Sequence, residues 1–149
     1  MTSCGEYGLR CMIDITFHNG HGPVSISELS KRQRLPHPYV AKILSQLKGA
    51  RLIRSVRGPK GGYELGRPPR EITLRHILNA LEGDITETLA NRYPDPLNGS
   101  MRLGDWGLRP VWLRLARRTN EILEEANLEL IVQKENQTRR ALGLPVGGA

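Results

Sequence analysis

Lysine and arginine side chains are concentrated in one stretch of this 149-residue chain. From Lys31 to Arg75 there are twelve Lys or Arg residues and only two acids, a net charge of about +10, whereas the whole chain carries +7. The remainder of the chain is therefore slightly acidic. Ammonium and guanidinium groups gathered in one small module neutralise phosphates and release their counterions. This charge distribution predicts a nucleic-acid-binding surface.

The elements that must position these charges lie between residues 25 and 66. Ser25 and Glu28 have the spacing of a capping box, which predicts the start of a short helix. A tight turn follows near Arg34, and Pro38 suits the first turn of a second helix. The apolar residues of that second helix recur at helical spacing and predict its buried face: Val40, Ile43, Leu44 and Leu47.

A two-stranded wing is expected directly after this helix. Residues 52–56 alternate apolar and basic side chains, as a half-buried strand does, and residues 63–65 provide the returning strand. The turn between them contains Gly58, Gly61 and Gly62, which leave a slender basic tip around Arg57 and Lys60. A helix, a turn, a second helix and a wing predict a winged helix-turn-helix domain.

Such a second helix places its exposed face in the major groove, where base edges can be distinguished. An arginine at the wing tip suits the narrow, electronegative minor groove. The predicted DNA contacts are Ser27, Pro36, His37, Pro38, Tyr39, Lys42, Lys48, Arg51, Arg57, Gly58 and Lys60. Further basic residues of the module are assigned to phosphates: Lys31, Arg32, Arg34 and Arg54. Tyr39 could instead pack against the protein, and the basic surface could belong to a protein-binding winged helix.

The rest of the chain is expected to be mainly helical, so the fold class is mainly α with a small β wing. Ser3 and Glu6 suggest a capped first helix. Residues 1–83 would form the winged helix-turn-helix domain, 84–107 an irregular loop, 108–136 a dimerisation helix region and 137–149 a flexible tail. Within a long helix from Pro110, residues at spacings of three and four predict a dimer seam: Trp112, Leu115, Thr119, Ile122 and Ala126.

Sensing chemistry is weakly represented in the sequence. Cys4 and Cys11 fall seven residues apart in one predicted helix, about 10 Å, which is too far for a disulfide. With Glu6 they are the candidate metal or redox residues, although no metal site is predicted. No phosphate-binding loop joins a strand to a helix, and no nucleophile has an identifiable base, so an enzyme is not expected. No apolar run could span a bilayer, so we expect a cytoplasmic protein without a membrane partner.

The segments GLRCMIDITFH and VSISELSKRQRLPHPYVAKILSQLKGARLIRSVRGPKGGYELGRPPREITLRHILNALEG resemble the Rrf2 family of bacterial winged-helix transcription regulators. The wing, SVRGPKGGYELGRP, is the most specific part, and the resemblance covers residues 2 to 85. It implies a homodimer in which the long C-terminal helices cross and the two winged-helix domains bind a palindromic DNA sequence. It also supports residues 36–42 and Arg57-Gly58 as DNA contacts.

The resemblance has one departure. Cluster-bearing members of the family have three cysteines in the region corresponding to residues 85–110, where this chain has neither Cys nor His. A [2Fe–2S] cluster of the family type is therefore not expected. Glu6 corresponds to a position at which some members use an acidic cluster ligand.

The resulting prediction is a homodimeric, sequence-specific transcription regulator, a repressor in its simplest form, that binds double-stranded DNA without a cluster. A regulatory protein or a small-molecule effector would control it. The alternative is an iron–sulfur or thiol-redox sensor that uses Glu6, Cys4 and Cys11. A protein-binding adaptor is the third hypothesis.

Overall fold

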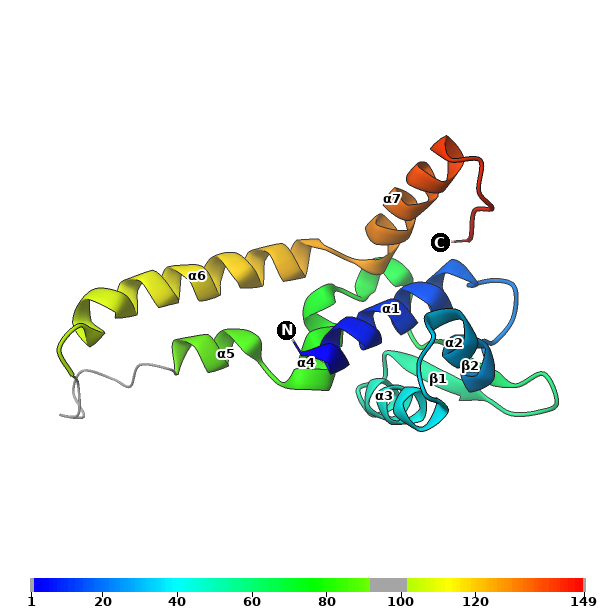
Figure 1. Ribbon diagram of the computed structural model, residues 1–149, viewed down its shortest axis with the longest axis horizontal. Coiled ribbons are helices and arrows are strands. Elements are labelled where there is room, and N and C mark those ends of the chain that lie inside the picture. Colours follow the sequence, from blue (N-terminus) through cyan, green and yellow to red (C-terminus); the bar gives the residue numbers. More distant parts are fainter. Residues whose placement is uncertain (1, 92–101, 149) are drawn as a thin grey trace.

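The structure is a computed structural model that describes residues 2–91 and 102–148. It consists of a helical head from which one long helix projects (Figure 1). The head contains α1–α4, a two-stranded wing and α7, whereas α6 extends away from it with α5 alongside. The elements are α1 (Ser3–Phe17), α2 (Ile26–Gln33), α3 (His37–Gly49), β1 (Ile53–Val56), β2 (Gly62–Leu65), a 3₁₀ turn (Pro69–Glu71), α4 (Leu74–Glu82), α5 (Ile85–Ala90), α6 (Asp105–Glu125) and α7 (Leu128–Ala141). The predicted class, mainly α with a small β wing, is confirmed.

The helix-turn-helix unit begins and ends as its sequence predicts. Ser25 caps α2, and its backbone and hydroxyl both donate to the Glu28 carboxylate in a complete capping box. Pro38 lies in the first turn of α3. The predicted buried face of α3 is completely enclosed in the core: Val40, Ile43, Leu44 and Leu47. These residues set the direction of the opposite, exposed face of α3.

The start of α1 differs from the predicted Ser3–Glu6 capping box. Thr2 is the N-cap residue, and its hydroxyl accepts a hydrogen bond from the Gly5 N–H. The carboxylate of Glu82, on α4, accepts from the Thr2 N–H at 2.6 Å and from the Gly5 N–H at 3.1 Å. Glu6 instead forms an ion pair with Arg10 one helical turn later. The prediction was wrong because a residue 77 positions away from Gly5 supplies the acceptor.

The wing is an antiparallel pair in which Ile53 lies opposite Leu65 and Val56 lies opposite Gly62. Val24 adds a bridge through two 2.8 Å hydrogen bonds with Tyr63. The expected apolar–basic alternation is incomplete, because Leu52 and Ile53 are both buried in succession. Leu52 enters the core before the strand begins.

Residues 84–107 are not irregular throughout, contrary to the prediction. Asp84 caps α5 by accepting from the N–H groups of Thr86 and Glu87, a local signal that the sequence reading missed. The long helix starts at Asp105 rather than at Pro110, which lies inside α6. Pro110 is the sixth residue of α6, beyond the first turn, so it lacks the N–H that would donate to the Trp106 carbonyl, yet the helix continues past it. Residues 92–101 lie outside the described part of the chain.

The segment after residue 137 continues α7 to Ala141, and residues 142–148 then fold back on that helix. The buried Asn136 amide donates to the Gly147 carbonyl and accepts from the Gly147 N–H, both at 2.9 Å. Arg139 donates to the Pro145 carbonyl at 3.1 Å. The Gly- and Pro-rich composition of residues 143–148 gave no indication of these hydrogen bonds.

The junction between α6 and α7 is tied to the head. The Leu74 N–H donates to the Ala126 carbonyl at 2.8 Å, and the Leu128 N–H donates to the Ile72 carbonyl at 3.0 Å. Leu128 has no exposed surface and belongs to the same core as α3. The helix that follows α6 is therefore an integral part of the head, not of a separate C-terminal unit.

Candidate DNA interface

The exposed face of α3 contains Pro38, Lys42, Ser45 and Lys48, all on the side opposite the core. Their spacings of three and four residues place them along one face of the helix. His37 and Pro36 lie exposed at its start. Ser45 was not predicted, although its distance of three residues from Lys42 was a usable signal. This face offers two ammonium groups and a hydroxyl group in positions suited to base edges or phosphates.

Tyr39 does not share that exposure. Its ring is half-buried and packs edge-on against Tyr7 of α1, with 5.8 Å between centroids. Desolvation, and then the neighbouring Cys4 thiol, raise the pKa of Tyr39. Tyr39 therefore fits the alternative reading, in which it anchors the start of α3, and its expected solvent orientation was wrong.

Two arginines flank α3 in left-handed backbone conformations, Arg34 with φ 55° and Arg51 with φ 58°. Both side chains are exposed, and Arg34 closes the turn between α2 and α3. A non-glycine residue in this conformation costs roughly 1–2 kcal/mol. Both guanidinium groups are thus placed at the two ends of α3, where they are open to solvent.

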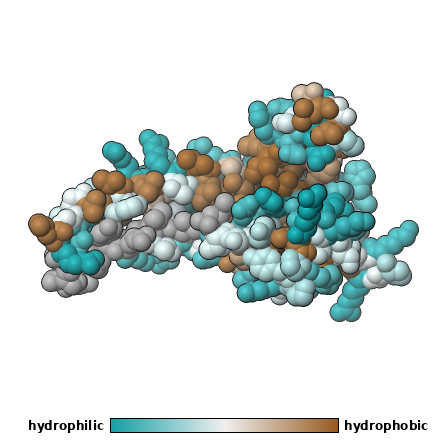
Figure 2. Space-filling model, viewed as in Figure 1, coloured by the Kyte–Doolittle hydropathy of each residue, from teal (hydrophilic) through white to brown (hydrophobic). Residues whose placement is uncertain are grey.

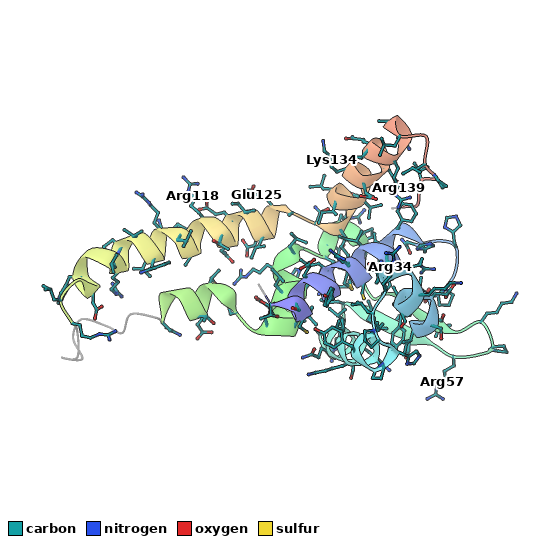
Figure 3. All side chains as sticks on the ribbon, in the orientation of Figure 1. Arg34, Arg57, Arg118, Glu125, Lys134 and Arg139 are labelled. Atoms are coloured by element: carbon teal, nitrogen blue, oxygen red, sulfur yellow. The ribbon has the colours of Figure 1, made fainter. Side chains whose placement is uncertain are left out.

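The wing tip presents Arg57 and Lys60 to solvent, and Figure 3 shows the Arg57 side chain projecting away from the head. Gly58 adopts φ 121°. A Cβ on Gly61 would lie 2.3 Å from the Val56 carbonyl oxygen, so the tight turn itself requires glycine there. The glycines thus have a structural role in addition to the close approach to DNA predicted from the sequence.

Not every basic residue of the module is available for phosphate. Arg32 donates to the buried Asp14 carboxylate from Nε and Nη2, the latter at 2.7 Å. Arg54 pairs with Glu64 across the wing at 2.8 Å, but its side chain is 70% exposed, so this weak surface pair leaves it open to a phosphate. The charged surface that remains uncommitted is narrower than the sequence suggested. It follows the turn, the exposed face of α3 and the wing tip.

The Rrf2 family, described as "Iron-dependent Transcriptional regulator", matches residues 1–134. The chain belongs to the Rrf2 family. It is 31% identical over 148 residues to the HTH-type transcriptional regulator IscR of Sodalis glossinidius (strain morsitans), covering 95% of this chain and 90% of the relative. It is 32% identical over 125 residues to the HTH-type transcriptional regulator CymR of Bacillus subtilis (strain 168), covering 84% and 83%.

Solved Rrf2 structures support the same conclusion. T. potens IscR superposes with a TM-score of 0.76 at 29% identity, covering 93% of this chain and 90% of that one. CymR, the global cysteine regulator of B. subtilis, gives a TM-score of 0.72 at 31% identity, covering 87% and 92%. The protein is a DNA-binding transcription regulator of the winged-helix type. Family membership also confirms that it is not an enzyme.

The predicted dimer seam is only partly exposed in this Rrf2 chain. Leu115 and Ile122 face solvent, whereas Trp112, Thr119 and Ala126 are half-buried. Trp106 is exposed near the start of α6, and four further exposed apolar residues form a different stripe along this helix, where Figure 2 shows hydrophobic groups: Leu108, Val111, Leu115 and Ile122. α5 and α4 cover the other side of α6, and the predicted seam shares Leu115 and Ile122 with this stripe.

The candidate sensing residues do not converge. Cys11 is completely buried, and burial followed by the charge of Asp14 raises its pKa to about 12. The Cys4 thiol donates to Gln46 of α3 at 3.9 Å, and both cysteines are free. Across the described ranges, no three His, Cys, Asp or Glu side chains form a group that could hold a metal ion. Within the same ranges, no helix is long and apolar enough to cross a membrane.

Proposed function

We propose that this Rrf2 protein acts as a homodimer that binds a palindromic operator, with α3 in the major groove and the wing tip in the minor groove. The observation that carries the proposal is the apolar stripe of α6, defined by Leu108, Val111, Leu115 and Ile122. Spacings of three, four and seven residues are those of a helix–helix seam. Exposed contiguous apolar surface is uncommon in monomeric proteins and marks a site of interaction.

Dimerisation would set the geometry of DNA binding. Two identical heads related by a twofold axis read two half-sites of opposite orientation, so the operator mirrors the protein symmetry. Lys42 and Ser45 would read base edges, while Arg34, Lys48 and Arg51 would contact phosphates. A simple consequence is repression, because a dimer seated on a promoter excludes polymerase. Such a protein would work in the cytoplasm, where the chromosome lies.

The direct test combines Ile122→Asp with molar-mass measurement by light scattering and with operator binding. Ile122→Asp is expected to yield a monomer and to lower operator affinity at least tenfold, while each head still binds a half-site weakly. Leu130→Asp is the matched control, because Leu130 is an exposed leucine on α7, outside the stripe. A dimeric, fully active Ile122→Asp protein would contradict the proposal.

We further propose that this regulator works without a [2Fe–2S] cluster. The residues present fit such a group poorly, because one of the two cysteines is buried with its pKa raised to about 12 and a cluster ligand must be a thiolate. Protein purified anaerobically should lack stoichiometric iron and acid-labile sulfide and should still bind its operator. A full complement of cluster would overturn this proposal and favour sensing through Glu6, Cys4 and Cys11.

A further inference from the structure

A hollow of about 360 Å³ lies where the end of α1, α2 and α7 meet. Neither α3 nor the wing contributes to its described lining, so it is separate from the candidate DNA interface. Its volume falls within the range of small-molecule sites in proteins, about 300–1,000 Å³.

The lining combines an apolar wall with nitrogen donors. Ile13 and Phe17 provide the wall, and His18, Arg32 and Arg139 provide the donors. Each of these three side chains is about one-third exposed, at 36%, 33% and 34% respectively. His18 Nδ1 and the Arg32 guanidinium already face Asp14, so a ligand entering the hollow would be met by Arg139, which lies over the Phe17 ring.

The two acids of the hollow differ in accessibility. Asp14 is 5% exposed, and its carboxylate already accepts from Arg32 and Gln33. Glu135 is 46% exposed and pairs with Arg139 one turn along α7, at 2.8 Å. Exposed pairs of this kind contribute little to stability. A ligand carboxylate could replace Glu135 beside Arg139 at small cost, whereas Asp14 could not be replaced.

Arg139 is held in position for this exchange. Its guanidinium carbon lies 4.8 Å from the centroid of the Phe17 ring, and its Nη1 donates to the Pro145 carbonyl. Figure 3 shows Arg139 on the side of α7 that faces the end of α1. A guanidinium stacked on an aromatic ring and fixed by a backbone carbonyl is pre-organised for a carboxylate.

We infer that this hollow binds a small monocarboxylic acid with a flat apolar body. The carboxylate pairs with Arg139 in place of Glu135, and the apolar body lies against Ile13 and Phe17. The site also regulates DNA binding, because Arg32 in its wall belongs to α2, which precedes α3. This regulatory part rests on the function proposed above: occupancy and operator binding must change each other's affinity by the same factor.

The test uses the full chain with benzoate and phenylacetate as probes and benzamide as the uncharged control, followed by NMR titration. Both acids should bind in the millimolar range or tighter, and benzamide should bind at least tenfold more weakly. Glu135→Gln removes the internal competitor and should tighten benzoate binding severalfold. Arg139→Gln should weaken it at least tenfold, and Arg140→Gln, the neighbouring exposed arginine, should leave it unchanged.

Several outcomes would overturn the inference: equal binding of benzamide, weaker binding to Glu135→Gln, or an equal effect of Arg140→Gln. Thermal unfolding of each variant separates loss of the site from loss of the fold. Operator affinity is then measured with and without benzoate. Binding of benzoate without any change in operator affinity would overturn the regulatory part alone. Failure of the ligand-free protein to bind any operator would instead count against the proposed function.

Discussion

The guanidinium of Arg32, on α2, encloses the carboxylate of Asp14, on α1, with Nη2 2.7 Å and Nε 3.0 Å from Oδ1. Gln33 completes the site by donating to Oδ2 at 2.7 Å. Since Asp14 is buried, these donors replace the water that its charge would otherwise require. The interaction locks the first helix of the helix-turn-helix unit onto α1.

Arg32→Ala should therefore destabilise the protein by about 2–3 kcal/mol, because it leaves a buried carboxylate without its main partner. This is less than the 3–5 kcal/mol typical of broken buried pairs, since the guanidinium is one-third exposed. Urea unfolding of the wild type and the variant measures the difference. Lys31→Ala, a change at the exposed neighbour, should alter stability by less than about 0.5 kcal/mol. Equal stability of both variants would mean that the pair contributes nothing.

Arg57→Ala should reduce operator binding by roughly 1–3 kcal/mol, because the side chain projects from the wing tip toward the expected minor groove. Its effect should be larger for the cognate operator than for unrelated DNA. Fluorescence anisotropy with both DNAs at fixed salt tests this. Arg140→Ala, at an exposed arginine of α7 outside both the wing and the α6 stripe, serves as the control and should leave both affinities intact. An equal loss on all DNA would reassign Arg57 to phosphate binding.

Lys48→Ala should weaken binding to all sequences alike, because Lys48 lies near the end of α3, where it meets phosphate rather than bases. The slope of log affinity against log salt should become shallower by about one. Binding titrations at several salt concentrations give this slope. A change in sequence preference would contradict the assignment.

Glu28→Gln should reduce stability at neutral pH, and the difference should disappear in acid. Hydrogen bonds from the Ser25 backbone and hydroxyl hold the pKa of Glu28 below its ordinary value of 4.5. A carboxylate with a lowered pKa stabilises the fold above the unfolded pKa, and this is lost as pH falls through the folded pKa. Thermal unfolding from pH 7 into acid measures the effect, which is small because the side chain is largely exposed. In a Ser25→Ala background, the stability difference caused by Glu28→Gln should become smaller. If it stays the same, the capping box is not its cause.

Cys11 should resist thiol reagents in the folded protein, so that the native chain is labelled at Cys4 alone. Burial raises the pKa of Cys11 to about 12 and withholds the reactive thiolate. The same shift predicts a stabilisation that is complete below pH 9 and is lost as pH rises toward 12. Mass spectrometry after labelling with and without denaturant counts the modified thiols. Rapid double labelling of native protein would contradict the buried position.

The features predicted well from the sequence are those that depend on nearby residues. The capping box at Ser25, the proline in the first turn of α3 and the apolar face of that helix all arise within a few positions. The glycine-rich wing turn is equally local, because Gly61 must avoid the Val56 carbonyl. Together these elements were enough to predict a winged helix-turn-helix domain.

The errors fall where a distant residue decides the outcome. Glu82 supplies the acceptor at the start of α1, Gly147 pairs with Asn136, and Asp14 takes Arg32 away from phosphate. Tyr39 was misplaced for the same reason, since its partner Tyr7 lies on another helix. Periodicity identified α6 but only part of its exposed side, because the helices that cover it are separated from it in sequence.

Because Ala126 and Leu128 are hydrogen-bonded to the backbone at the start of α4, the length of α6 fixes the position of the head relative to the far end of that helix. A helix of 21 residues spans about 31 Å. Because its end is clamped to the head, each inserted residue would shift the head by about 1.5 Å and turn it by about 100°. In a dimer joined through α6, single insertions would put the two heads out of phase with the double helix, whereas seven residues would nearly restore their orientation. In the proposed dimer, the length of α6 would therefore set the spacing of the operator half-sites, and that spacing would change only in steps of whole heptads.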